Sequence, residues 1–484
     1  MKKNDLFSLL KSLSKSEKRH FRIFCSRSGS DPNYLRLFDV MDALEVYDER
    51  VVREKLAGEP FLRQLHVTKN YLRQMILKSL RDYHTGLSKD AELKDCLRNV
   101  EILFHRELYD LCGEELGRAE KMAETYGLNI GLAEVCNWQR KLAQTLSPND
   151  FDRFANAVER QENALRLQEN TLQFWQLAIR FSRSFIGDGA GRPVDAGLLD
   201  APENARTLEA KVLYYNTLYL VRLRNGNEEE AETALLELIG MLEGHPQRLF
   251  ADPGAYISTV NNLVSFQVYR KSYDKALDQL SRARGVFQRL EIPGEHKSLL
   301  KQLLRAYNIE LEICRVSGAW RERPDFILDT SRFVDRYRNK MPQSYLESFY
   351  FQLAYIRFMR KEYDDSLRWI NLLLNLKAAQ IERADLQAHI RMLNLMVHFE
   401  QQNWFVMRYF TDSVRRWLRK SGRIEPYQQA LLQFFSRIGN VPEYEFKDRF
   451  RELAGILFPP GAESLVPAGA LEMVDYRAWI SARY

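Results

Sequence analysis

Basic side chains occur in two stretches with a spacing that could bind an anion. In the first, lysines and arginines recur at intervals of three and four residues after Ser14, while Phe21 and Phe24 point the other way. The residues of this cationic helix face are Lys15, Lys18, Arg19 and Arg22. In the second, Tyr409 and Trp417 are interleaved with cations, of which the candidate binding residues are Arg415, Arg416 and Arg419. Cations neutralise phosphates and aromatic rings stack on bases, so both stretches are candidates for binding an anionic partner or a nucleic acid.

Each basic stretch also has a simpler interpretation. A cationic helix face is often only the solvated side of an amphipathic helix, and aromatic residues in a helical array usually fill the seam between helices. The charge is nevertheless uneven, because residues 1–27 hold eight lysines and arginines against two acids, which equals the whole net charge of +6. Residues 51–57 and 67–80 vaguely resemble a helix-turn-helix. A nucleic-acid-binding regulator, with residues 1–88 as the reader and a helical array as the sensor, is therefore the alternative function.

No arrangement of residues in the sequence is typical of an enzyme. The eight histidines never occur as HxH or HExxH, and the motifs of serine hydrolases and kinases are absent. The glycines of residues 187–191 are not followed by the Gly-Lys-Ser/Thr of a phosphate-binding loop. Acidic runs at residues 228–230 and 364–365 stand at expected helix starts, where the helix dipole favours acids. We therefore expect a non-enzymatic protein without a cofactor or a metal.

A turn motif recurs through the C-terminal half of the chain. Residues 270–277 and 360–367 share Arg, Lys, Tyr, Asp and Leu in register, 90 residues apart. Residues 226–231 contain Ala231, which lies 45 residues before Ala276, so the period is near 45. In each motif polar residues end one helix and an aromatic residue begins the next, after which Tyr273, Ala276, Leu277 and Leu280 recur at helical spacing. A fixed period of this size is typical of a solenoid of stacked helical hairpins.

This turn–aromatic–acidic–x–Ala–aliphatic pattern resembles the tetratricopeptide repeat, over roughly residues 90–457. Ala283 falls where that family places a second small residue, whereas Ser366 replaces the first in a later copy. The period is also longer than the 34 residues of that family. The resemblance implies an all-α, right-handed superhelix whose concave face binds a protein or peptide. We expect a protein- or peptide-binding scaffold or adaptor whose partner the sequence does not identify.

Chain breakers and composition divide the sequence into five parts. We expect a basic helical N-terminal domain at residues 1–88, helical hairpins at 89–186, a loop or joint at 187–204, a regular repeat array at 205–457, and a C-terminal loop with a capping helix at 458–484. Ser14 and Glu17 predict a capping box. Leu277 and Leu367 are expected to be buried between paired helices, and Tyr476 and Trp479 to dock the C-terminal segment.

The cysteines and the hydropathy pattern bear on the compartment. Five cysteines, odd in number and never in a CxxC pair, favour a reducing environment over a disulfide framework or structural zinc. The N-terminus begins like a signal peptide, but its apolar run ends at Lys11 and no small-residue cleavage site follows. No run of 18 apolar residues is present. We expect a cytoplasmic protein without a membrane span.

Overall fold

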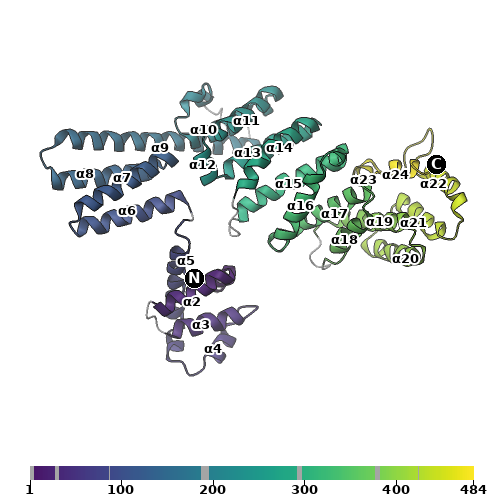
Figure 1. Ribbon diagram of the computed structural model, residues 1–484, viewed down its shortest axis with the longest axis horizontal. Coiled ribbons are helices and arrows are strands. Elements are labelled where there is room, and N and C mark those ends of the chain that lie inside the picture. The colour runs from purple at the N-terminus through teal and green to yellow at the C-terminus, as the bar shows by residue number, and fades with distance from the viewer. Residues whose placement is uncertain are drawn as a thin grey trace. The chain divides into compact units, whose positions relative to one another are not determined.

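A computed structural model of the chain describes residues 5–27, 32–86, 88–186, 196–290, 297–376, 382–422 and 424–484. All regular elements of these residues are helices, as predicted (Figure 1). The chain forms two compact units: residues 1–176 with 203–210, and residues 177–202 with 211–484. The glycine-rich stretch at 187–191 lies outside the described residues, and the predicted limits of the five segments remain predictions. No described helix is long and apolar enough to cross a membrane.

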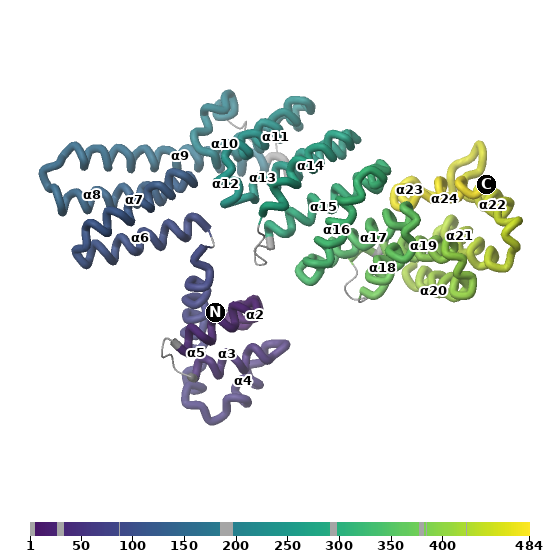
Figure 2. Tube along the Cα trace, in the orientation of Figure 1, coloured from purple at the N-terminus to yellow at the C-terminus, as the bar shows by residue number. Residues whose placement is uncertain are grey.

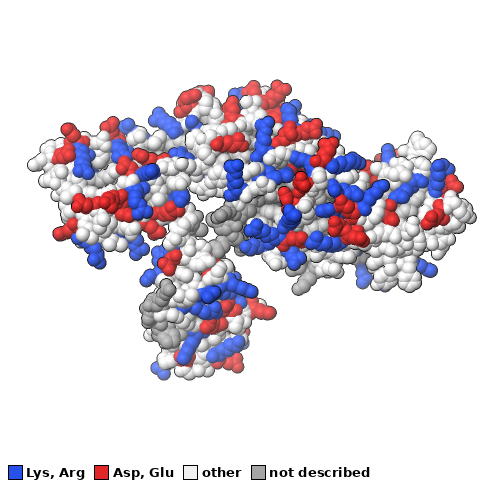
Figure 3. All heavy atoms as spheres, in the orientation of Figure 1, with Lys and Arg blue, Asp and Glu red and all other residues white. Residues whose placement is uncertain are grey.

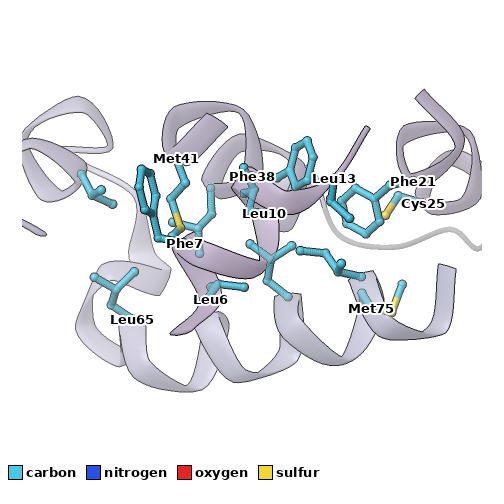
Figure 4. Close-up of a cluster of buried hydrophobic side chains, with 14 of the residues drawn as sticks. Leu6, Phe7, Leu10, Leu13, Phe21, Cys25, Phe38, Met41, Leu65 and Met75 are labelled. Carbon is cyan, nitrogen blue, oxygen red and sulfur yellow. The ribbon is translucent and has the colours of Figure 1, made fainter. Parts of the chain in front are cut away.

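The first unit begins with a cluster of short helices and continues with longer ones. Its elements are α1 (Asp5–Ser12), α2 (Lys15–Arg27), α3 (Pro32–Ala43), α4 (Glu49–Lys55), η1 (Pro60–Gln64), α5 (Leu65–Tyr83), α6 (Lys89–His105), α7 (Tyr109–Tyr126), α8 (Asn129–Leu146) and most of α9 (Phe151–Ile186). In the first cluster, Leu10, Phe21 and Phe38 meet in one apolar core (Figure 4). A second core, with Leu93, Val100 and others, joins α6, α7 and α8.

The predicted capping box at the start of α2 is confirmed. The Ser14 N–H donates to Glu17 Oε2 at 2.6 Å, and the Glu17 N–H donates to Ser14 Oγ at 3.2 Å. Each side chain therefore satisfies a backbone donor that the first helical turn leaves unpaired. This cap fixes where α2 begins, and with it which residues face solvent.

The second unit is a succession of helix pairs, which Figure 2 traces from α13 to α22. Its elements are η2 (Ala196–Leu199), η3 (Pro202–Asn204, across the unit boundary), α10 (Leu208–Arg224), α11 (Glu228–Glu243), α12 (Pro246–Ala251), α13 (Gly254–Tyr269), α14 (Tyr273–Arg289), α15 (Lys297–Ser317), η4 (Ala319–Arg321), α16 (Pro324–Tyr337), η5 (Arg338–Lys340), α17 (Gln343–Met359), α18 (Tyr363–Leu374), α19 (Ala384–Glu400), α20 (Trp404–Ser421), α21 (Pro426–Ile438), η7 (Glu443–Glu445), α22 (Phe446–Leu457), α23 (Ala468–Met473) and α24 (Tyr476–Ser481). We call α13, α15, α17 and α19 the first helices and α14, α16, α18 and α20 the second helices. Each first helix packs on the next first helix along the chain.

The turns between paired helices repeat the same backbone conformation. Each turn contains one residue with positive φ, and in chain order these are Gly226, Lys271, Gly318, Lys361 and Gln402. This conformation therefore recurs every 41 to 47 residues, in agreement with the predicted period. After Lys361, the Glu362 N–H donates to the Arg357 carbonyl at 2.9 Å, and the equivalent bonds follow Lys271 and Gln402. This six-residue closure satisfies carbonyls at the end of the first helix. The recurring turn is therefore a structural repeat as well as a sequence repeat.

Packing beside these turns follows the predicted pattern, with one correction. Ala276, Ala283 and Leu277 are buried, as expected for residues between paired helices. Ser366, at the position of Ala276, is also buried, and its hydroxyl donates to the Ala354 carbonyl at 2.8 Å. Leu367 is only partly buried, so its predicted burial was wrong. The seam of α18 is filled instead by Trp369, whose ring centroid lies 5.7 Å from that of Tyr350 on α17.

Candidate functional site

The cationic face of α2 is present, but acids of α3 neutralise part of it. Lys18 Nζ lies 2.6 Å from Asp42 Oδ1, and Arg22 Nη2 lies 2.8 Å from Asp39 Oδ1. Phe21, on the opposite side, is buried. Two of the four predicted cations are therefore already paired within the first unit.

The other two cations of this face remain available. Lys15 and Arg19 are exposed and form no ion pair with any residue that the structure describes. Lys and Arg are interspersed with Asp and Glu on the visible face of each unit (Figure 3). The free charge of α2 is thus smaller than its sequence suggests.

The second basic stretch lies on α20, in the other unit. Arg415 Nη1 is 3.0 Å from Asp412 Oδ1, whereas Arg416 and Arg419 are exposed and form no ion pair with described residues. The two interleaved aromatic residues differ in environment. Tyr409 is exposed, but Trp417 is partly buried, with the Arg391 guanidinium of α19 centred 4.0 Å from its ring. Trp417 therefore packs between helices, as in the simpler of the two interpretations.

A further surface, which the sequence did not reveal, lies on the side of the first helices that is turned away from the second helices. On α17, Tyr350 packs on the second helix α18. Because each residue turns a helix by about 100°, Ser348, Gln352 and Tyr355 lie on the opposite side of α17. We call this surface the first-helix face, made up of Ser265, Tyr269, Arg305, Asn308, Tyr345, Ser348, Gln352 and Tyr355.

Hydrogen bonds between side chains cross this face from one first helix to the next. Arg305 Nη2 of α15 donates to Ser265 Oγ of α13 at 3.0 Å. Asn308 Oδ1 of α15 accepts from Ser348 Oγ at 2.7 Å and from Gln352 Nε2 at 2.9 Å, both on α17. The first-helix face is therefore a polar surface whose donors and acceptors are held in place by their neighbours.

The C-terminal segment of the chain lies against the last part of this face. Arg315 of α15 donates to the main-chain carbonyl of Met473 at 3.3 Å and also to that of Glu472. The Asp475 N–H donates to the Tyr355 hydroxyl of α17 at 3.2 Å. Side chains of two first helices thus bind main-chain groups at the end of α23 and just before α24.

Side chains of the C-terminal segment complete this attachment. Trp479 Nε1 donates to Glu400 Oε1 at the end of α19 at 2.7 Å, and Arg483 forms an ion pair with the same carboxylate. The Trp479 ring lies among aromatic rings, with its centroid 5.3 Å from Phe450 and 5.8 Å from Phe399. The predicted docking of this segment is confirmed, since Tyr476 and Trp479 are both buried.

Burial shifts the ionisation of the groups at this attachment. It lowers the pKa of Arg315 and raises that of the Tyr355 hydroxyl. Burial also raises the pKa of Tyr476 well above its usual range, and lowers that of His389 on α19 to about 4. Carbonyl oxygens carry partial negative charge, so the carbonyls of Glu472 and Met473 compensate the Arg315 guanidinium for the water that it has lost.

The described residues offer little for metal or nucleophilic chemistry. They contain no group of three or more His, Cys, Asp or Glu that could hold a metal ion. The five cysteines are buried and form no disulfide, and burial raises the pKa of the Cys314 thiol to about 12. A thiol with so high a pKa is a poor nucleophile because little of it is thiolate. No protein-family model matches the chain, and a search of curated proteins found no relative.

The positions of the turns in the sequence indicate which residues form the first-helix face. Tyr269, a residue of this face, stands two positions before Lys271, which has positive φ. Counting back at intervals of three and four from the position two residues before the positive φ reaches Ser265 on α13, and Tyr355, Gln352 and Ser348 on α17. The motif therefore marks the face, although only packing shows which side the second helix covers.

Proposed function

We propose that this chain is a non-enzymatic, tetratricopeptide-like scaffold that binds a protein or peptide on its first-helix face. The observation that carries the proposal is the attachment of the C-terminal segment, in which Arg315 and Tyr355 bind main-chain groups. Such contacts depend little on the sequence of the bound segment, so the same type of surface suits a peptide from another protein. The five buried cysteines form no disulfide, which fits a reducing compartment, and we propose a cytoplasmic location.

The part of the first-helix face that the C-terminal segment does not reach is where we place the partner. Tyr269 is 77% exposed there and Arg305 is exposed. Asn308 and Ser348 are partly buried. An exposed aromatic ring and an arginine are the side chains that contribute most often to binding energy at protein interfaces. Fixed polar groups beside them supply donors and acceptors for a peptide main chain.

A peptide library displayed on phage, selected against the full chain, tests this proposal. The affinity of the selected peptides is then measured by fluorescence anisotropy for the wild type and two variants. Arg305→Ala and Tyr269→Ala should each weaken binding by about tenfold or more, as expected for central interface residues. Arg282→Ala, an exposed arginine on the second helix α14, is the matched control and should bind like the wild type. Selected peptides that bind all variants equally would contradict the proposed site.

On the predicted cationic face of α2, the exposed Lys15 and Arg19 favour the alternative function, nucleic-acid binding by residues 1–88. If Lys15 and Arg19 are the phosphate contacts, the slope of log affinity against log salt should be about −2, rather than the value of −4 to −5 expected for five contacts. A gel shift with duplex DNA at two salt concentrations measures this slope. The double variant Lys15→Gln/Arg19→Gln should abolish it. No shift at micromolar protein and low salt would exclude α2 as the reader.

A further inference from the structure

Helix α9 carries a row of exposed apolar side chains in addition to its buried face. Its buried face includes Ala157, Ala164 and Phe174. One residue further along the chain from the two alanines, Val158 and Leu165 are about half exposed, at 50% and 51%. The part of this row that lies in the first unit, which we call the α9 stripe, is between 45% and 71% exposed and consists of Phe151, Val158, Leu165, Leu172 and Trp175.

The spacing of the α9 stripe follows the a positions of a coiled-coil seam, whereas two of the d positions hold Gln161 and Gln168. The first four residues recur every seven positions, and Trp175 follows Leu172 by three, as a and d positions do. On a straight helix, residues seven positions apart are displaced around the axis by about 20°. A row with a strict seven-residue repeat therefore suits a partner helix that winds around α9. A row of exposed apolar side chains along one helix is a feature of interaction sites. The stripe therefore has the form of one half of a helix–helix interface.

The charges beside the stripe indicate what kind of helix fits it. Glu162 and Glu169 are exposed and follow Val158 and Leu165 by four positions, which corresponds to the e position of a heptad. Glu162 is paired with Arg166 on its own helix at 2.7 Å, whereas Glu169 forms no ion pair with described residues. The g positions hold small buried residues, among them Ala164. Two acids thus flank the stripe on its exposed side, and Glu169 has no opposing charge among the described residues.

A second copy of this chain does not satisfy these charges. In an antiparallel pair of α9 helices, the e positions face each other, which would oppose glutamate with glutamate. In a parallel pair they face the g positions, where this chain offers only uncharged residues such as Ala157 and Ala164. We propose that the α9 stripe binds an amphipathic helix of another protein, with apolar residues in heptads and lysine or arginine at the flanking positions.

Two synthetic peptides of four heptads test the proposal with the full chain. Both carry leucine at the a and d positions. The basic peptide has lysine at the flanking e and g positions, and the acidic peptide has glutamate there. In fluorescence anisotropy, the basic peptide should bind the full chain at least about tenfold more tightly than the acidic peptide. Leu165→Gln should weaken that binding by about tenfold, whereas Leu111→Gln, at an exposed leucine of α7, is the matched control and should not.

A charge-reversed variant separates this site from unspecific attraction of a basic peptide. Glu162→Lys/Glu169→Lys changes two exposed residues, so the helix content should be retained, and the variant should now prefer the acidic peptide. The proposal is overturned if neither peptide shows saturable binding, or if the charge reversal leaves the preference unchanged. It is also overturned if sedimentation shows a dimer of the full chain that Leu165→Gln dissociates, because the occupant of the stripe would then be a second copy.

Discussion

Replacing Trp479 by alanine should detach the C-terminal segment from the first helices. The side chain is only 8% exposed, and its ring is surrounded by Phe399, Phe435 and Phe450. Truncating a buried tryptophan costs about 3–5 kcal/mol. The lost hydrogen bond to Glu400 adds little, because that carboxylate still accepts from the Tyr363 hydroxyl of α18 at 3.2 Å. We therefore expect a loss of about 3–5 kcal/mol in the free energy of unfolding of the second unit.

Urea denaturation followed by circular dichroism measures this loss, and limited trypsin digestion shows where it occurs. Cleavage at Arg477 and Arg483 should become much faster in Trp479→Ala, because local detachment exposes the main chain. Trp175→Ala, at a residue that is 45% exposed, is the control and should cost less than about 1 kcal/mol. The reasoning is refuted if Trp479→Ala costs less than about 1 kcal/mol, or if digestion at the two arginines is unchanged.

Three further stability predictions follow from the packing of the second unit. Because the folded state lowers the pKa of His389 from 6.5 to about 4, only the unfolded chain takes up this proton between those values. The free energy of unfolding should therefore fall as pH falls from 6.5 to 4, by up to about 3 kcal/mol. The variant His389→Asn should remove that part of the pH dependence, whereas His66→Asn, at an exposed histidine, should not. Lys361→Gly should raise the free energy of unfolding by about 0.5–1 kcal/mol, since glycine adopts φ 62 without steric cost, and a lower urea midpoint would contradict this. In urea denaturation, Leu277→Ala should lower the free energy of unfolding by about 2–5 kcal/mol, but Leu367→Ala by only about 1 kcal/mol. Equal losses would contradict the difference in burial between the two leucines.

The repeated turns could be predicted from the sequence because their determinants are local. A polar step, a residue that tolerates positive φ and an aromatic residue at the start of the next helix lie within a few positions of one another. The capping box of Ser14 and Glu17 was predictable for the same reason. The error at Leu367 arose because Trp369, two residues later, is larger and reaches Tyr350 on α17. Which of two nearby apolar residues fills a seam depends on the partner helix.

The candidate site could be predicted only in part, because it depends on contacts between distant segments. The spacing of Lys18 and Arg22 placed them on one face of α2, but their pairing with Asp39 and Asp42 requires the position of α3. Arg315 precedes the carbonyl of Met473 by more than 150 residues, so no local pattern relates the two. The heptads of α9 are visible in the sequence, yet only the structure distinguishes an exposed stripe from a buried one.

The location of a bound peptide on the second unit tests the central claim most directly. A peptide selected on the full chain, synthesised with a benzophenone side chain, can be photo-crosslinked to the wild-type protein and the modified residues identified by mass spectrometry. We predict that the crosslinks lie on α13, α15 and α17 beside Tyr269, Arg305 and Ser348. Crosslinks confined to the exposed sides of α14, α16 and α18, or to the first unit, would contradict binding on the first-helix face.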